Sequence, residues 1–167
     1  MSTVVTLLED HSIYIILSLR GAQPGFHWGI FVPTNKPEGE VWHATNAGGG
    51  WNLENKTTRG IPNSMSLCVV LKLGIATSQN WTALHTTLAN VPCSGQPSLN
   101  TGEPFTCRIW VKDAILALHN AGVIQLTAAI ETIEEKAVKA AEKNRNKVER
   151  AAGAAQVDNN TGFSTTS

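Results

Sequence analysis

Two short runs with alternating side chains, joined by a turn, constrain the fold of this chain more than any other feature. Residues 26–32 (FHWGIFV) and 40–45 (EVWHAT) are rich in aromatic and β-branched residues, which favour strands. Residues 33–39 (PTNKPEG) lie between them and contain Pro, Asn and Gly, which favour turns. The pattern predicts a β-hairpin.

Alternation within this hairpin places its two histidines on one face. Neighbouring side chains in a strand point to opposite faces, so His27 lies opposite Trp28, and His43 lies opposite Trp42. A register that aligns the two tryptophan faces puts both imidazoles on the other face, directly across or diagonal, roughly 5–8 Å apart. Gly29 has no side chain, and we expect it to leave space beside them.

A cysteine opens the helix that we predict over residues 107–118 (CRIWVKDAILAL), with Thr106 as its N-cap. In the first turn, unpaired backbone N–H groups and the positive end of the helix dipole stabilise a thiolate and lower the pKa of a thiol. Helical offsets place the thiol on the core-facing stripe, which comprises Cys107, Val111, Ala114 and Leu118. We therefore expect Cys107 to face the sheet as a nucleophile, with an imidazole as its base.

The remaining segments predict a mixed α+β domain. Residues 13–19 and 66–73 are apolar and β-branched, which favours buried strands. Gly48 opens a polar stretch that we interpret as a long loop reaching residue 63. Two weaker predictions are a strand over residues 3–7 and a helix over residues 79–88 that Ser78 caps.

The C-terminal third is polar and charged. Residues 127–152 are rich in Ala, Glu and Lys, which favours a long, largely exposed helix. Its apolar stripe is thin and comprises Ile130, Ile133, Ala137, Ala141 and Val148. We expect this helix to lie across the domain or against a second copy of the chain, which makes it a candidate homodimer surface. The predicted organisation is a domain over residues 1–124, this helix within 125–152 and a disordered tail over 153–167.

Composition excludes several classes of function. The chain has 167 residues, enough for one core, and its 13 basic and 13 acidic residues give no net charge. With this balance we expect no large surface of positive potential that would bind nucleic acid. We find neither the roughly 20 apolar residues that span a bilayer nor a secretory signal at the start, so we expect a cytoplasmic protein. The three cysteines are far apart and form no C-x-x-C pair, so we predict no disulfide, metal or other cofactor.

The order of these motifs resembles a known family. A His-Trp-small-apolar strand in residues 26–32, a second histidine at position 43 and a polar residue plus Cys at 106–107 occur in that order, with Trp110 three residues after the Cys. The pattern resembles the lecithin:retinol acyltransferase-like branch of the NlpC/P60 superfamily, and small fungal proteins that carry it. The resemblance covers roughly Phe26 to Leu118. It implies a circularly permuted papain-like fold, in which a small antiparallel sheet packs on the cysteine-bearing helix.

The resemblance also implies roles for the residues. Cys107 would be the nucleophile, His27 the general base and His43 the group that orients His27, with the Cys107 N–H contributing to an oxyanion hole. The family has Asn-Cys-Glu-His-Phe where this chain has TCRIW at residues 106–110. This departure, and the lack of the C-terminal membrane anchor of lipid-handling members, argue against phospholipid and retinoid substrates.

We therefore predict a thiol enzyme of acyl transfer on an ester, thioester or amide of a small molecule, such as a natural product of fungal secondary metabolism. Hydrolysis, transfer to an acceptor and cyclisation are all compatible with the pattern. Trp28, Gly29 and Trp51 are the candidate substrate-binding residues. Three alternatives remain: an inactive binding module on the same fold, a cysteine isopeptidase, and an assembly protein that works through its long helix.

Overall fold

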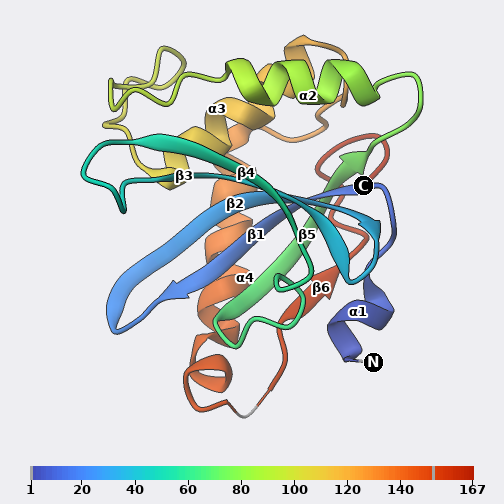
Figure 1. Cartoon of the computed structure of the whole chain (residues 1–167), viewed down its shortest axis with the longest axis vertical. Helices are drawn as coiled ribbons and strands as arrows, with labels where there is room; N and C mark the ends of the chain where they lie inside the picture. The colour runs from blue at the N-terminus through green and yellow to red at the C-terminus, as the bar shows by residue number, and fades with distance from the viewer. Residues whose placement is uncertain (1, 152) are drawn as a thin grey trace.

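Within residues 2–151 and 153–167, which the computed structural model describes, the chain forms a six-stranded sheet and four helices (Figure 1). The strands are β1 (Ser12–Arg20), β2 (Gln23–Asn35), β3 (Glu38–Thr45), β4 (Asn52–Thr58), β5 (Leu67–Ile75) and β6 (Gln156–Asp158). The helices are α1 (Thr3–Leu7), α2 (Trp81–Asn90), α3 (Cys107–Asn120) and α4 (Ile130–Glu149). The sheet order is β4-β3-β2-β1-β5-β6, antiparallel except for the parallel pair of β5 and β6.

The predicted hairpin is present as β2 and β3. Ile30 pairs with Trp42 in this antiparallel ladder, so the two tryptophan-bearing faces coincide as the alternation predicts. The ladder runs from Asn35 to Ile30 on β2, so the first half of this long strand pairs only with β1. The end of β2 that carries His27 therefore lies beyond its hydrogen-bonded contact with β3.

The two faces of the sheet are covered by different elements. The face that we call the helix face packs against α3 and α4, and its buried side chains include Ile15, Leu17, Trp28, Ile30, Trp42, Val69 and Leu71. The opposite face, which we call the α1 face, packs against α1 through Tyr14, Ile16, Phe31, Val41 and Val70. Figure 1 shows α4 running behind the sheet and α1 beside β6. Strand alternation thus assigns each residue of β2 and β3 to one of these two environments.

Helix α3 forms as the sequence predicts. Its N-cap is Thr106, whose hydroxyl accepts a hydrogen bond from the Ile109 N–H at 3.3 Å. The apolar stripe is buried against the helix face, and Trp110 is fully enclosed. The cap and the stripe together fix where the helix begins and how it is rotated, and both position Cys107.

Three local predictions were wrong, two in the type of element and one in where a helix begins. Residues 3–7 form a helix, because Ser2 caps it by accepting from the Val5 N–H and because Val4 and Val5 are buried by tertiary contacts. These contacts outweigh the strand propensity of β-branched residues. The predicted long loop over 48–63 contains β4, which pairs with β3 along its whole length. Helix α2 begins two residues later than predicted, with Asn80 rather than Ser78 at its N-cap.

The C-terminal segment is ordered, so the prediction of a disordered tail over 153–167 was wrong. Residues 156–158 add to the sheet beside β5, and Phe163 is buried in the core. The Ser164 hydroxyl donates a 2.7 Å hydrogen bond to the Leu73 carbonyl. Backbone pairing at the β5 edge and one aromatic anchor hold this segment, although its composition is polar.

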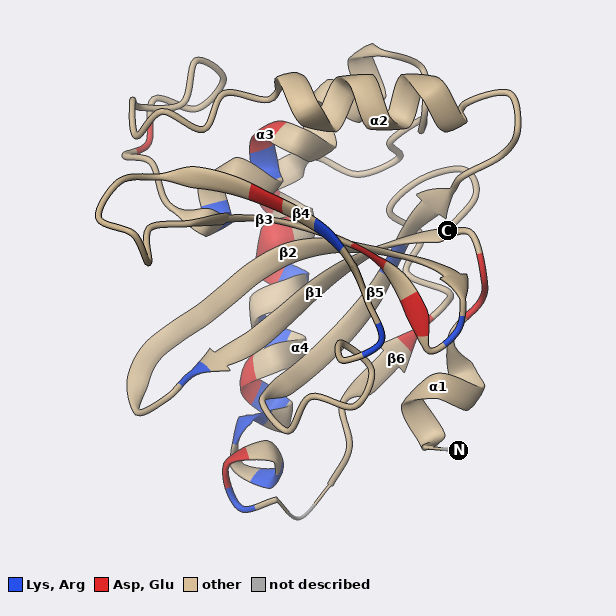
Figure 2. Cartoon of the chain, viewed as in Figure 1, with Lys and Arg blue, Asp and Glu red and all other residues tan. Residues whose placement is uncertain are grey.

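Helix α4 uses the predicted stripe within the same chain. All five predicted stripe residues are buried, and Asn144 joins them by donating a 2.9 Å hydrogen bond to the Cys68 carbonyl. Since α4 packs against β1 and β5, this stripe offers no free surface to a second copy. Figure 2 shows residues of both signs interspersed along α4. Among the described residues, no helix has both the length and the apolarity needed to cross a membrane.

A histidine attaches α2 to the sheet. His85 donates from Nδ1 to the Trp81 carbonyl at 2.8 Å and from Nε2 to Glu40 Oε1 on β3 at 2.8 Å. Both ring nitrogens face acceptors, which only the imidazolium form satisfies. Burial lowers the pKa of His85, but the hydrogen bonds to Trp81 and Glu40 outweigh it, and the net pKa is raised above the ordinary 6.5.

We predict that this contact makes stability depend on pH. Because the folded pKa of His85 is raised, its contribution is fully present below pH 6.5 and is lost as pH rises through the higher folded pKa. Urea unfolding from pH 5.5 to pH 9 should show this loss of unfolding free energy. The variant His85→Leu should lack this part of the pH dependence, and an identical dependence in the variant would contradict the prediction.

Candidate functional site

Two histidines and a glutamate form a hydrogen-bonded chain across three strands. His27 on β2 lies 2.8 Å from His43 on β3, measured from Nε2 to Nδ1, and the two rings meet edge to face with centroids 4.9 Å apart. His43 Nε2 lies 2.7 Å from Oε1 of Glu54 on β4. His43 pairs directly with Glu54 in the β3–β4 ladder, so adjacent strands place all three groups on the α1 face.

Proton positions along this chain follow from its last acceptor. A carboxylate only accepts, so His43 Nε2 carries a proton that it donates to Glu54. In neutral His43 the other nitrogen, Nδ1, then accepts a hydrogen bond from the N–H at His27 Nε2. This arrangement leaves the lone pair of His27 Nδ1 free. The hydrogen bonds from His27 to His43 and from His43 to Glu54 thereby fix the orientation of the His27 ring.

Electrostatics keep His27 neutral at physiological pH. Burial is the largest of the causes that together lower the pKa of His27 from 6.5 to about 4; a protonated His43 and Arg20 act in the same direction, and Glu54 opposes them. The pKa of Glu54 is lowered by its hydrogen bond from His43 and, next, by that from Lys56. At pH 7 this hydrogen-bonded series therefore has a neutral imidazole, His27, at one end and an ionised carboxylate, Glu54, at the other.

Cys107 lies at the first position of α3, half-buried, where its side chain packs against the core of the helix face. Its thiol makes a weak contact with the Phe26 carbonyl, with Sγ 4.0 Å from the oxygen. Burial raises the pKa of the Cys68 thiol to about 11 and also raises that of Cys93. Cys107 differs from both of these cysteines in its position, because it opens a helix.

A cleft of about 570 Å³ joins these groups. Cys107 lines it from the start of α3, and His27 lines it from β2. The other walls come from the β1–β2 hairpin, the end of β3 with the loop after it, and α4. Its remaining lining residues are Arg20, Gly25, Phe26, Trp28, Ala44, Thr45, Asn46, Ala47, Trp51, Thr106, Arg108, Glu134, Val138 and Glu142.

The structure brings the two imidazoles together, as the register predicts, but does not bond either of them to the thiol among the described residues. Alternation puts His27 and His43 on the α1 face, whereas α3 packs on the helix face. Sγ of Cys107 is 4.0 Å from the Phe26 carbonyl oxygen, and this peptide leads directly to His27, so Sγ lies within about 7 Å of the His27 Cα. Thiol and base therefore share one cleft from opposite sides of the β2 backbone.

The candidate substrate-binding residues separate into two groups. Trp28 and Trp51 line the cleft as predicted. Gly29 leaves no free space, because a Cβ there would lie 3.2 Å from the Trp42 carbonyl oxygen and 3.4 Å from the His43 Cβ. The close approach of β3 and the His43 side chain fills the position where we expected room for a thiol or a substrate.

Sequence reasoning missed Glu54 and the charged residues of the cleft. Glu54 lies in β4, whose only apolar residue is Leu53, so periodicity gave little signal for a strand. Arg108 follows Cys107 directly and pairs with Glu134 of α4, which places an ion pair at the cleft wall. In the described part of the chain, no group of three or more His, Cys, Asp or Glu side chains is arranged to hold a metal ion.

The comparisons with known proteins identify a family without an assigned activity. A family of unknown function (DUF6540) matches residues 13–125, and the chain belongs to this family. This span runs from β1 to the end of α3 and includes Cys107, both histidines and Glu54. No curated protein and no solved structure matches the chain.

Proposed function

We propose that this member of the DUF6540 family is a cysteine-dependent acyl-transfer enzyme with the permuted papain-like fold of NlpC/P60 proteins. One observation carries the proposal: a single cleft is lined both by the thiol at the start of α3 and by a histidine that a His43–Glu54 chain orients. A thiol at a helix N-terminus and an oriented neutral imidazole are the two groups that nucleophilic acyl transfer requires.

His27 would act as a base and then as an acid in both halves of the cycle, first toward Cys107 and the leaving group. In the second half it would take the proton of the water or other acceptor that attacks the acyl group and return it to the Cys107 sulfur. His27 Nδ1 takes the proton of Cys107, and the thiolate attacks the carbonyl carbon of an ester, thioester or amide. Unpaired N–H groups of the first turn of α3 stabilise the oxyanion. His27 returns the proton to the leaving group, and the acyl-cysteine is then released to water or to another acceptor.

This reaction requires the His27 ring to reach Cys107 past the edge of β2, where β2 no longer pairs with β3. The β2–β3 ladder ends at Ile30, so no hydrogen bond to β3 closes the backbone at His27. A small acyl group fits a cleft of this volume.

A non-catalytic binding module is the second candidate. It is favoured by the placement of both imidazoles on the α1 face and by the missing bond between Cys107 and His27 within the described residues. On this hypothesis the histidine chain stabilises the three strands, and the cleft holds a ligand without reacting with it. The two candidates differ in the reactivity of Cys107.

Alkylation of the intact protein with iodoacetamide at pH 7 separates them. The enzyme hypothesis predicts that Cys107 is labelled at least about tenfold faster than Cys68 or Cys93, because burial raises the pKa of the other two thiols. The variant His27→Ala should slow the labelling of Cys107, as peptide mass spectrometry would measure.

The matched control is His119→Ala, at the far end of α3, which should leave the labelling rate unchanged. Slow labelling of all three cysteines, unaffected by His27→Ala, would contradict the enzyme hypothesis and favour the binding module.

A further inference from the structure

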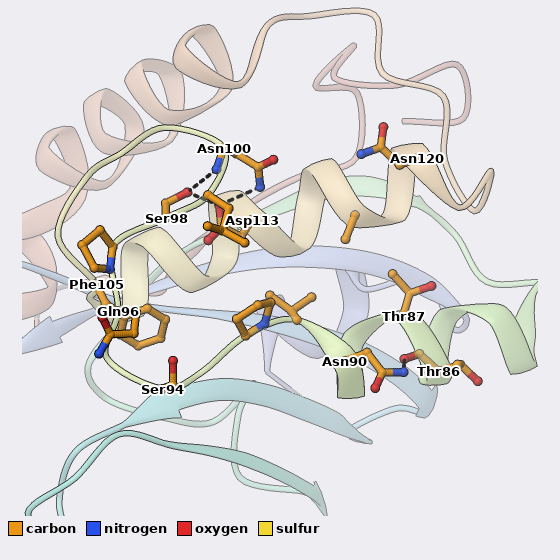
Figure 3. A pocket seen from close by; sticks show the side chains of 15 residues that line it. Thr86, Thr87, Asn90, Ser94, Gln96, Ser98, Asn100, Phe105, Asp113 and Asn120 are labelled. Carbon is orange, nitrogen blue, oxygen red and sulfur yellow. Dashed lines mark hydrogen bonds between the residues drawn. The ribbon is translucent and has the colours of Figure 1, made fainter.

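A second cavity, of about 720 Å³, lies between α2, α3 and the loop that joins them (Figure 3). It shares no lining residue with the cleft of Cys107. Its apolar wall comprises Val91, Pro92, Pro97, Leu99, Phe105 and Ala117. Volume and apolar character match those of small-molecule binding sites in proteins.

Asp113 is the single charged residue in the described lining of this cavity, and it is buried. Its Oδ1 accepts hydrogen bonds from Ser98 Oγ at 2.7 Å and from Asn100 Nδ2 at 3.1 Å, both from the loop (Figure 3). Its other oxygen, Oδ2, has no hydrogen-bond partner among the described residues. Oδ2 is not among the buried atoms that lack a partner, so it is open to the cavity and can accept a hydrogen bond from a bound ligand, above all from a cation.

The nearest cations of α3 are bound elsewhere. Lys112 donates to Glu103 and Glu134, and Arg108 pairs with the same two carboxylates. The charge of Asp113 is therefore left without a cationic partner within the described chain.

The shape of the cavity limits the ligand. Asp113, Ala117 and Asn120 follow one another at helical offsets, so one face of α3 lines the cavity over about 10 Å.

We propose that this cavity binds a small organic amine, with its ammonium group on Asp113 Oδ2 and an apolar body of up to about 10 Å along α3. The ammonium supplies the missing donor, and the body covers the apolar wall. This site is independent of the acyl-transfer proposal, since no residue of the cleft takes part.

The test measures binding of 2-phenylethylammonium to the full chain by calorimetry, with 2-phenylethanol as the neutral probe of similar shape. We expect the ammonium to bind at least about tenfold more tightly, the usual effect of one charge-assisted hydrogen bond. The variant Asp113→Asn should remove this preference and leave binding of the alcohol nearly unchanged.

Asp113→Asn could also weaken the hydrogen bonds that hold the loop, so a second variant tests the cavity without changing Asp113. Ala117→Trp keeps every polar contact and fills the cavity from α3, so both probes should lose binding. The proposal is overturned if neither probe binds, if the two bind equally well, or if Ala117→Trp binds the ammonium as tightly as the natural chain.

Discussion

Replacing His27 by Ala is expected to lower acyl transfer by about 10²- to 10⁴-fold, the contribution usual for a general acid–base group. Cys107→Ala should abolish it, because no other thiol lines the cleft in the described chain. The measurement is hydrolysis of 4-nitrophenyl acetate, with the acetyl group on Cys107 detected by mass spectrometry. Equal rates for the natural chain and His27→Ala would remove His27 from the mechanism.

The pH profile gives a sharper signature of the same base. Because the pKa of His27 is about 4, it remains unprotonated well below neutral pH, and kcat/KM should fall on the acid side only near pH 4. An ordinary histidine would give this fall near 6.5. Glu54→Gln should lower the rate less than His27→Ala, since it removes the charge behind His43 and leaves the base. Lys56→Gln, which alters only the exposed partner of Glu54, should have little effect.

The elements that could be predicted are those whose burial on one side produces a regular spacing of apolar residues in the sequence. The tryptophan-bearing face of the β2–β3 hairpin and the stripe of α3 are both apolar, so alternation predicted the register of the hairpin and helical offsets predicted the buried side of α3. The hydroxyl of Thr106, directly before that stripe, predicted the cap. β4 was missed because its two faces are both polar. The C-terminal segment was missed because one buried residue, Phe163, anchors a polar stretch.

The relative positions of the candidate site residues were predicted only in part. Alternation placed His27 and His43 together, but it cannot tell which face of a sheet a helix covers. That choice depends on the summed packing of α3 and α4 against Trp28 and the other apolar residues of that face. The same apolar alternation that pairs the imidazoles therefore places them away from the body of α3.

An ion network around one buried residue, Lys112, should have the largest effect on stability. Lys112 is 3% exposed and donates to Glu103 and to Glu134, at 2.9 Å for Glu134 Oε1. Burial lowers the pKa of Lys112, but its bonds to the two carboxylates outweigh this, so the pKa is raised. Glu134→Leu leaves the buried ammonium and the neighbouring Arg108 with one carboxylate between them. We expect this variant to lose about 3 kcal/mol of unfolding free energy, measured by urea denaturation.

The double variant Lys112→Met with Glu134→Leu tests whether charge imbalance is the cause. It removes one charge of each sign and leaves Arg108 paired with Glu103, so its stability should return most of the way to that of the natural chain. If the double variant is instead less stable than Glu134→Leu, the loss reflects side-chain packing between α3 and α4. Because Arg108 and Glu134 also line the cleft, the labelling rate of Cys107 in both variants would show whether this network fixes the start of α3.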